Sequence, residues 1–189
     1  MSSHESPLFQ ERALELLRAE GPLASHADGL RLFGRFVGAW DAEVVFYAED
    51  GAEVFRQPGE WSFSWALDGR CIQDVLIYPN AEAGLSAAVG QRRIGTTLRH
   101  FDSKTGHWRV VWLGATTGFL AVLTGRPVGD EIHIEGPDPE GHLLRWMFTA
   151  IEEDSFLWRG FLSRDGGATW RLTQEMPCRR RRASARAES

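Results

Sequence analysis

Residues 36–47 of this 189-residue chain read FVGAWDAEVVFY. Every second residue from Trp40 to Phe46 is apolar, and the residues between them include Asp41 and Glu43. Alternation with a period of two is typical of a β-strand that buries one face. The chain therefore changes at Phe36 from a helical leader to a strand.

The same period returns along the rest of the chain, and it is most regular where the buried face is aromatic. The clearest such segments are Trp61–Trp65, Trp108–Trp112, Trp146–Phe148, Phe156–Leu162 and Trp170–Met176. Glycine-rich turn signals separate them, and no helical pattern lies between them. The sequence predicts nine or ten short antiparallel strands. A barrel and a sandwich both fit this pattern, and we expect the up-and-down barrel because closure removes exposed strand edges.

Three regions are predicted from these boundaries. Residues 1–29 form a helical leader, in which Ser6-Pro7 starts a short amphipathic helix that Gly21-Pro22 ends. Residues 30–177 form the barrel. Residues 178–189 form an Arg-rich tail that we expect to be disordered, so deleting residues 179–189 should leave the fold and ligand binding unchanged.

Four sequence elements stand in a characteristic order. They are Val37-Gly38-Ala39-Trp40, Gly69-Arg70, the turn from Phe101 to Trp108 (FDSKTGHW), and a late Asp-Gly-Gly-x-Thr-Trp hairpin. In this order they resemble the DUF1579-type family of bacterial lipocalin-like (calycin) proteins over roughly residues 30–177. The resemblance implies an antiparallel barrel that holds a small apolar ligand, and it implies no reaction.

Composition narrows the functional classes. The net charge is −5, and the excess of acidic residues argues against a nucleic-acid-binding surface. No apolar run is long enough to span a membrane, and no secretory signal is recognisable. Two cysteines provide neither a disulfide framework nor a usual metal site, so we expect a cytoplasmic protein.

Catalytic and cofactor motifs are missing. The chain has no Gly-x-Ser-x-Gly nucleophile motif and no phosphate-binding loop. We expect no metal and no cofactor; haem is disfavoured because no histidine follows His142 to serve as an axial ligand. Residues 163–170 (SRDGGATW) match the Asp-box of sialidases, but a propeller needs one copy per blade, so we interpret this single copy as a structural turn around Asp165.

One histidine stands apart from the other five. His100 shares a strand face with Ile94, Thr96 and Leu98, and we expect that face to point into the barrel. A core histidine that a neighbour satisfies and a ligand-facing proton-transfer group both fit this position. His100 is therefore the candidate catalytic residue.

The aromatic content of eight Trp and eleven Phe has two interpretations, a filled core and a cavity with aromatic walls. We favour the cavity, because compact barrel cores usually use branched aliphatic residues. The candidate ligand-binding residues are Trp61, Trp65, Thr96, His100, Trp112, Trp146, Trp158 and Gln174.

The sequence thus favours a barrel that binds a small hydrophobic or aromatic molecule. Two alternatives stay open. One is a cofactor-free cyclase, isomerase or hydratase that acts on a polyketide- or terpenoid-like substrate. The other is a structural barrel without a ligand. The expected partner is a small hydrophobic ligand, with no nucleic acid and no membrane, and a homodimer also stays open.

Overall fold

The computed structural model describes residues 7–79 and 92–182. Two α-helices, α1 (Pro7–Leu17) and α2 (Ala27–Gly34), flank a short 3-10 turn and precede the strands. The ten strands are β1 (Gly38–Tyr47), β2 (Glu53–Ala66), β3 (Cys71–Tyr78), β4 (Arg93–Asp102), β5 (His107–Gly114), β6 (Phe119–Val128), β7 (Glu131–Pro137), β8 (Leu143–Thr149), β9 (Ser155–Ser163) and β10 (Arg171–Arg180).

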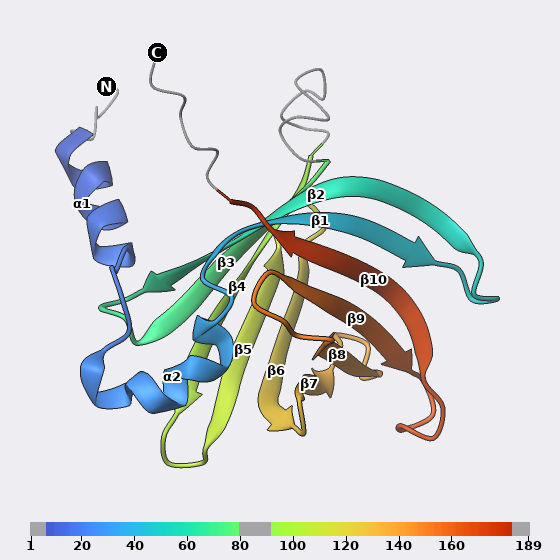
Figure 1. Cartoon of the computed structure of the whole chain (residues 1–189). Helices are drawn as coiled ribbons and strands as arrows, with labels where there is room; N and C mark the ends of the chain where they lie inside the picture. The colour runs from blue at the N-terminus through green and yellow to red at the C-terminus, as the bar shows by residue number, and fades with distance from the viewer. Residues whose placement is uncertain (1–6, 80–91, 183–189) are drawn as a thin grey trace, which may run out of the picture.

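Each strand pairs antiparallel with its neighbours in sequence, and β1 closes the circle by pairing with β10 (Figure 1). The prediction of an up-and-down antiparallel barrel with a short N-terminal helix is therefore confirmed. Each described strand therefore pairs with a neighbouring strand on both sides. Tight turns set this order, as at Gly106, whose φ of +70° lets β4 reverse directly into β5.

Helix α2 closes one end of the barrel. It lies where β4 leads into β5 (Figure 1), and its Leu30 and Phe33 are fully buried. The Phe33 ring packs edge-on against Trp108, with 4.8 Å between the ring centroids. Gly29 and Gly34 allow the helix to come this close, because a side chain at either position would overlap Phe101 or Trp65. The opposite end carries the turns β1–β2, β5–β6, β7–β8 and β9–β10, and neither of the two described α-helices covers it.

Strand β10 extends further than the sequence predicts. It continues to Arg180, and Trp40 of β1 pairs with Arg180, so residues 178–180 are part of the barrel and not of a disordered tail. Residues 183–189 lie outside the described part of the chain. The predicted boundary at residue 177 is wrong because Cys178, Arg179 and Arg180 pair with β1 and continue the last strand.

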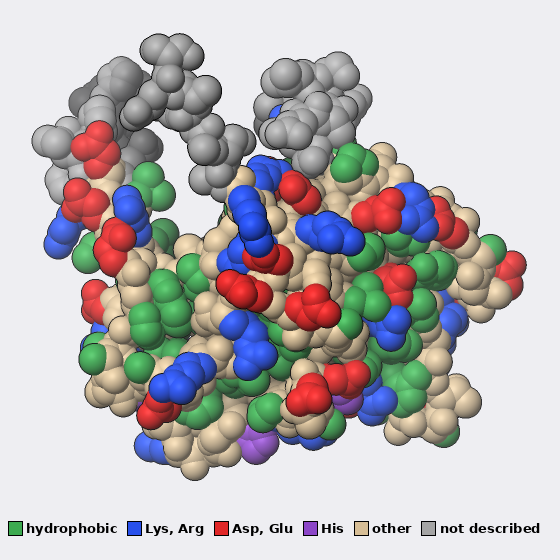
Figure 2. Space-filling view, viewed as in Figure 1, with side chains coloured by type: hydrophobic (Ala, Val, Ile, Leu, Met, Phe, Trp, Pro, Cys, Tyr) green, Lys and Arg blue, Asp and Glu red, His purple; other side chains and the backbone are tan. Residues whose placement is uncertain are grey.

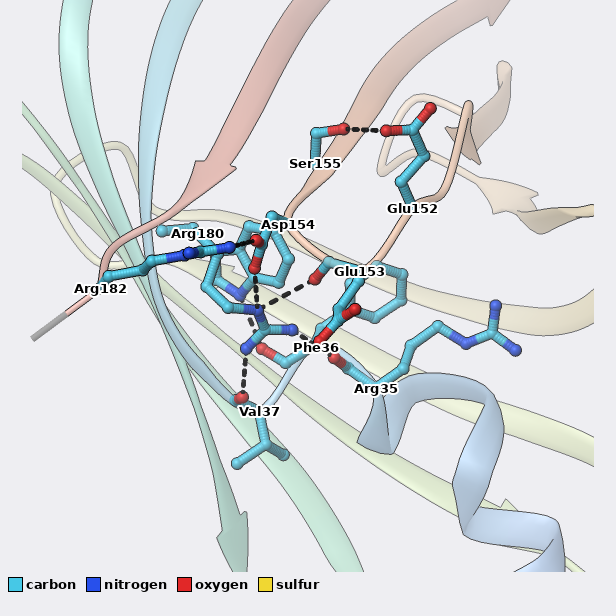
Figure 3. Close-up of polar contacts among 10 residues, drawn as sticks. Arg35, Phe36, Val37, Glu152, Glu153, Asp154, Ser155, Arg180 and Arg182 are labelled. Carbon is cyan, nitrogen blue, oxygen red and sulfur yellow. Dashed lines mark hydrogen bonds and ion pairs between the residues drawn. The ribbon is translucent and has the colours of Figure 1, made fainter.

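Arg180 connects three parts of the closed end (Figure 3). Its guanidinium donates to the backbone oxygens of Val37 (2.9 Å), Arg35 (2.7 Å) and Glu153 (3.0 Å). The guanidinium also stacks on the Trp40 ring, 4.1 Å from its centroid. The segment that follows α2, the start of β1 and the β8–β9 turn are thereby held together by one side chain.

Charged side chains of both signs are interspersed over β1, β2 and β10 (Figure 2). Arg56 bonds Glu43 and Glu53, and Arg181 bonds Asp41 and Glu60. These pairs are partly exposed, so each contributes little to stability.

The Asp-box turn between β9 and β10 has the structural role that the sequence predicts. Asp165 accepts hydrogen bonds from the Thr169 hydroxyl (2.6 Å), the Thr169 amide (2.9 Å) and the Ser163 hydroxyl (2.8 Å). The two glycines that follow have positive φ angles. The Thr169 and Ser163 hydrogen bonds lower the pKa of Asp165 to about 2.

This lowered pKa predicts a pH-dependent effect of Asp165→Asn. The carboxylate stabilises the turn above the unfolded-state pKa of about 4, and this stabilisation is lost as the pH falls toward 2. We expect the variant to melt a few degrees below the wild type at pH 7, and the difference to shrink between pH 4 and pH 2.5. Thermal unfolding followed by circular dichroism measures this, and a difference that does not change with pH would contradict the assignment.

Candidate functional site

The open half of the barrel contains a cavity of about 510 Å³. Its wall is mainly aromatic and aliphatic. The lining residues are Phe46, Phe55, Trp61, Leu76, Tyr78, Arg93, Thr97, Arg99, Trp112, Thr117, Phe119, Leu144, Trp146, Trp158, Thr173, Gln174 and Met176. A volume of this size is within the range of small-molecule sites, which is about 300–1,000 Å³.

Four tryptophans form a connected wall. Trp112 lies edge-on to Trp146, with 6.4 Å between ring centroids. Trp158 lies 5.9 Å from Trp146 and 6.3 Å from Trp61. The four residues lie on strands β2, β5, β8 and β9. Inward-facing positions recur every second residue along each strand, so the four rings point into the same cavity. The rings present flat apolar faces to whatever occupies the space between them.

A buried ion pair lies at the inner end of the cavity, above α2. Arg99 of β4 and Asp74 of β3 form a salt bridge, and their side chains are 2% and 0% exposed. The Thr97 hydroxyl also donates to Asp74, at 3.2 Å. The Arg99 guanidinium lies over Phe33 and Phe63, 5.1 and 5.3 Å from the ring centroids. The inner end therefore combines a neutralised charge pair with aromatic faces that favour the cation.

Two hydrogen-bond donors at this inner end have no partner among the described residues. They are Trp61 Nε1 and Arg99 Nε, and both atoms are buried. A buried donor without an acceptor costs about 1–3 kcal/mol. Both side chains line the cavity.

The outer end of the cavity is more polar. Arg93 and Tyr78 are paired across β3 and β4, and both line the opening. Burial raises the pKa of Tyr78 above its usual value of 10, although the charge of Arg93 opposes this shift. Tyr78 therefore stays protonated at neutral pH and is available as a hydrogen-bond donor.

Five of the eight candidate ligand-binding residues line the cavity: Trp61, Trp112, Trp146, Trp158 and Gln174. Gln174 donates to Met176 Sδ at 3.5 Å, a weak bond. Trp65 lies at the closed end against α2, where its ring packs over Gly34. Thr96 and His100 lie on the outer face of β4, so they do not line the cavity.

The expected inward orientation of His100 is wrong, and the reason is the apolar outer surface of β4–β6. His100 is exposed, as are its neighbours Ile94 and Leu98 on the same face. Leu98 of β4 pairs with Val111 of β5, which pairs in turn with Val122 of β6. Val111 and Val122 are 38% and 61% exposed. Both faces of these strands are apolar, so the strand period alone does not distinguish inside from outside.

Sequence reasoning missed Asp74, Thr97 and Arg99. Asp74 lies between Ile72 and Leu76 on one strand face, and a charge in such a position indicates either an outer face or a buried pair. The partner Arg99 is 25 residues away, and the pairing register that joins the two strands is needed to recognise it.

The described lining offers little for proton transfer or metal binding. Its ionisable side chains are Tyr78, Arg93 and Arg99. Cys178 is buried elsewhere in the core, and burial raises the pKa of its thiol. Asp138, Glu140 and His142 lie together in the β7–β8 turn, where Asp138 accepts hydrogen bonds from the His142 amide and ring. The described lining residues thus include no carboxylate, histidine or cysteine.

Comparisons with known proteins add the following. No protein-family model matches the chain, and no curated protein matches it in sequence. A solved structure described as the S-type phycobiliprotein lyase CPES from Guillardia theta is similar at a TM-score of 0.39 and 13% sequence identity, covering 86% of this chain and 100% of that one. Likeness at this level says nothing about the ligand or activity of this chain. None of its described helices has the length and apolar character to cross a membrane.

Proposed function

We propose that the protein binds one small, largely apolar or aromatic molecule inside the barrel cavity. The observation that carries the proposal is the cavity of about 510 Å³, walled by Trp61, Trp112, Trp146 and Trp158. Specific ligand sites combine such apolar walls with a few polar groups that fix orientation. Here Arg99 at the inner end and Arg93 at the opening supply those groups.

The alternative of a cofactor-free barrel enzyme loses its candidate residue, because His100 lies outside the cavity. No carboxylate is among the described residues that line the cavity, and the buried Asp74 is paired with the lining residue Arg99. No observation favours this alternative over binding. Membership of the DUF1579-type family, a cytoplasmic location and a homodimer remain predictions.

The binding of N-phenyl-1-naphthylamine tests the proposal. This neutral dye emits strongly only in an apolar site, so we expect its emission to rise and tryptophan emission to fall through energy transfer. Gln174→Trp fills part of the cavity and should weaken dye binding at least tenfold. Val122→Trp adds the same side chain on the outer surface, 61% exposed in the wild type, and should leave binding unchanged.

Two results would overturn the proposal. One is the absence of any emission change with the wild type. The other is equal loss of binding in both variants, provided that circular dichroism shows that both are folded, because the dye would then not be in the cavity.

A further inference from the structure

The two unpartnered hydrogen-bond donors at the inner end of the cavity indicate which chemical group a bound molecule would carry there. This inference rests on the proposed function. Trp61 Nε1 and Arg99 Nε are buried and unpaired within the described residues, and both side chains line the cavity. Trp61 as a whole is 3% exposed, and the Arg99 side chain is 2% exposed, so bulk water does not satisfy either group from outside.

The two side chains belong to the same end of the cavity because they share two aromatic neighbours. Trp61 lies 4.9 Å from Phe63 and 5.7 Å from Phe148, measured between ring centroids. The Arg99 guanidinium carbon lies 5.3 Å and 6.0 Å from the centroids of the same two rings. A molecule that reaches this end meets donors and aromatic faces.

The charge balance distinguishes a neutral acceptor from an anion. Asp74 already neutralises Arg99, and Thr97 donates a further hydrogen bond to the same carboxylate. A ligand carboxylate placed here would add an uncompensated negative charge in a buried site, which is costly. A carbonyl oxygen accepts hydrogen bonds from both donors without adding charge.

We propose that the ligand is a flat aromatic molecule with a neutral carbonyl group at its leading end, and that this oxygen binds Trp61 Nε1 and Arg99 Nε. The tryptophan wall would hold the ring system, and the more polar opening beside Arg93 and Tyr78 would face the opposite end. Ketones and quinone-like compounds have this chemistry, whereas aromatic hydrocarbons and aromatic acids do not.

Three probes of nearly equal shape test the inference: 2-acetylnaphthalene, 2-ethylnaphthalene and 2-naphthoate. Each probe is titrated against bound N-phenyl-1-naphthylamine, and the loss of dye emission gives its affinity. The ratio of ketone affinity to hydrocarbon affinity is then compared between the wild type and each variant. Trp61→Phe keeps an aromatic ring and removes the N–H. We expect this variant to lower the ketone-to-hydrocarbon ratio about fivefold, the effect of one net hydrogen bond of about 1 kcal/mol. Leu144→Met is the control, because it changes the same wall without removing a donor.

The outcomes separate the inference from the proposed function. A ratio that is the same in the wild type and Trp61→Phe overturns the carbonyl assignment while hydrocarbon binding still supports the cavity. Tighter binding of 2-naphthoate than of the ketone also overturns it, since the inner end would then prefer an anion. Failure of all three probes and of the dye overturns the proposed function itself. Thermal unfolding of Trp61→Phe establishes that a lower ratio does not come from loss of fold.

Discussion

Arg99→Met should lower the free energy of unfolding by about 3–5 kcal/mol, because removing one partner leaves a buried charge without its counter-charge. The Asp74 carboxylate is fully buried and, among the described side chains, would keep only the Thr97 hydroxyl as a donor. Equilibrium unfolding in urea, followed by tryptophan fluorescence and circular dichroism together, measures the loss.

The double variant Asp74→Leu, Arg99→Met is the matched control. Replacing both partners with apolar side chains of similar size leaves no buried charge, and such replacements are often neutral or stabilising. We expect the double variant to recover most of the stability that Arg99→Met loses. A single variant as stable as the wild type would contradict the burial of the pair, and a double variant no better than the single would show that Arg99 acts through packing on Phe33 and Phe63 instead.

The fold was predictable because the alternation of residues is clearest where one face is aromatic. Strands β1, β5, β8 and β9 place Trp40, Trp108, Trp146 and Trp158 inward, as their sequence phase predicts. The turns between strands also carry their own signals, and Asp165 bonds its turn in the way that the Asp-box pattern predicts. Local chemistry was therefore enough to indicate the strands and their antiparallel order.

The candidate site was only partly predictable, because it depends on which face of each strand points inward. On β4 the outward residues Ile94 and Leu98 are apolar, whereas the inward face carries Thr97 and Arg99. Hydrophobicity therefore assigns β4 to the wrong face. Neighbouring strands resolve the orientation, since Leu98 lies beside Val111 on the outside of the closed barrel.

The inner end of the site needs tertiary information for a further reason. A single charge on a strand, such as Asp74, is more often exposed than buried. Its burial follows from Arg99, which only the pairing of β3 with β4 brings beside it. A local β-irregularity adds another obstacle, because the register of β10 shifts between Leu172 and Gln174 and breaks the strand period there.

Arg180, at the end of β10, makes a large contribution to the stability of the closed end. Arg180→Ala should lower the free energy of unfolding by about 3 kcal/mol, because it removes charge-assisted hydrogen bonds to three backbone oxygens and a cation–π contact with Trp40. For a chain of this length such a loss corresponds to a fall of roughly 6–12 °C in melting temperature. Figure 3 shows why the loss should be large, since the guanidinium joins the residues that follow α2 to the β8–β9 turn.

Arg179→Ala is the matched control, because the neighbouring side chain is exposed and should change stability by less than about 0.5 kcal/mol. Truncation gives an independent comparison. A chain that ends at residue 182 keeps the Arg180 contacts and should melt with the full-length protein, whereas a chain that ends at residue 179 should melt with Arg180→Ala or below it. If both truncated chains melt like the full-length protein, Arg180 does not hold the closed end together, and the arginines from Arg180 onward behave as the solvated tail that their sequence suggests.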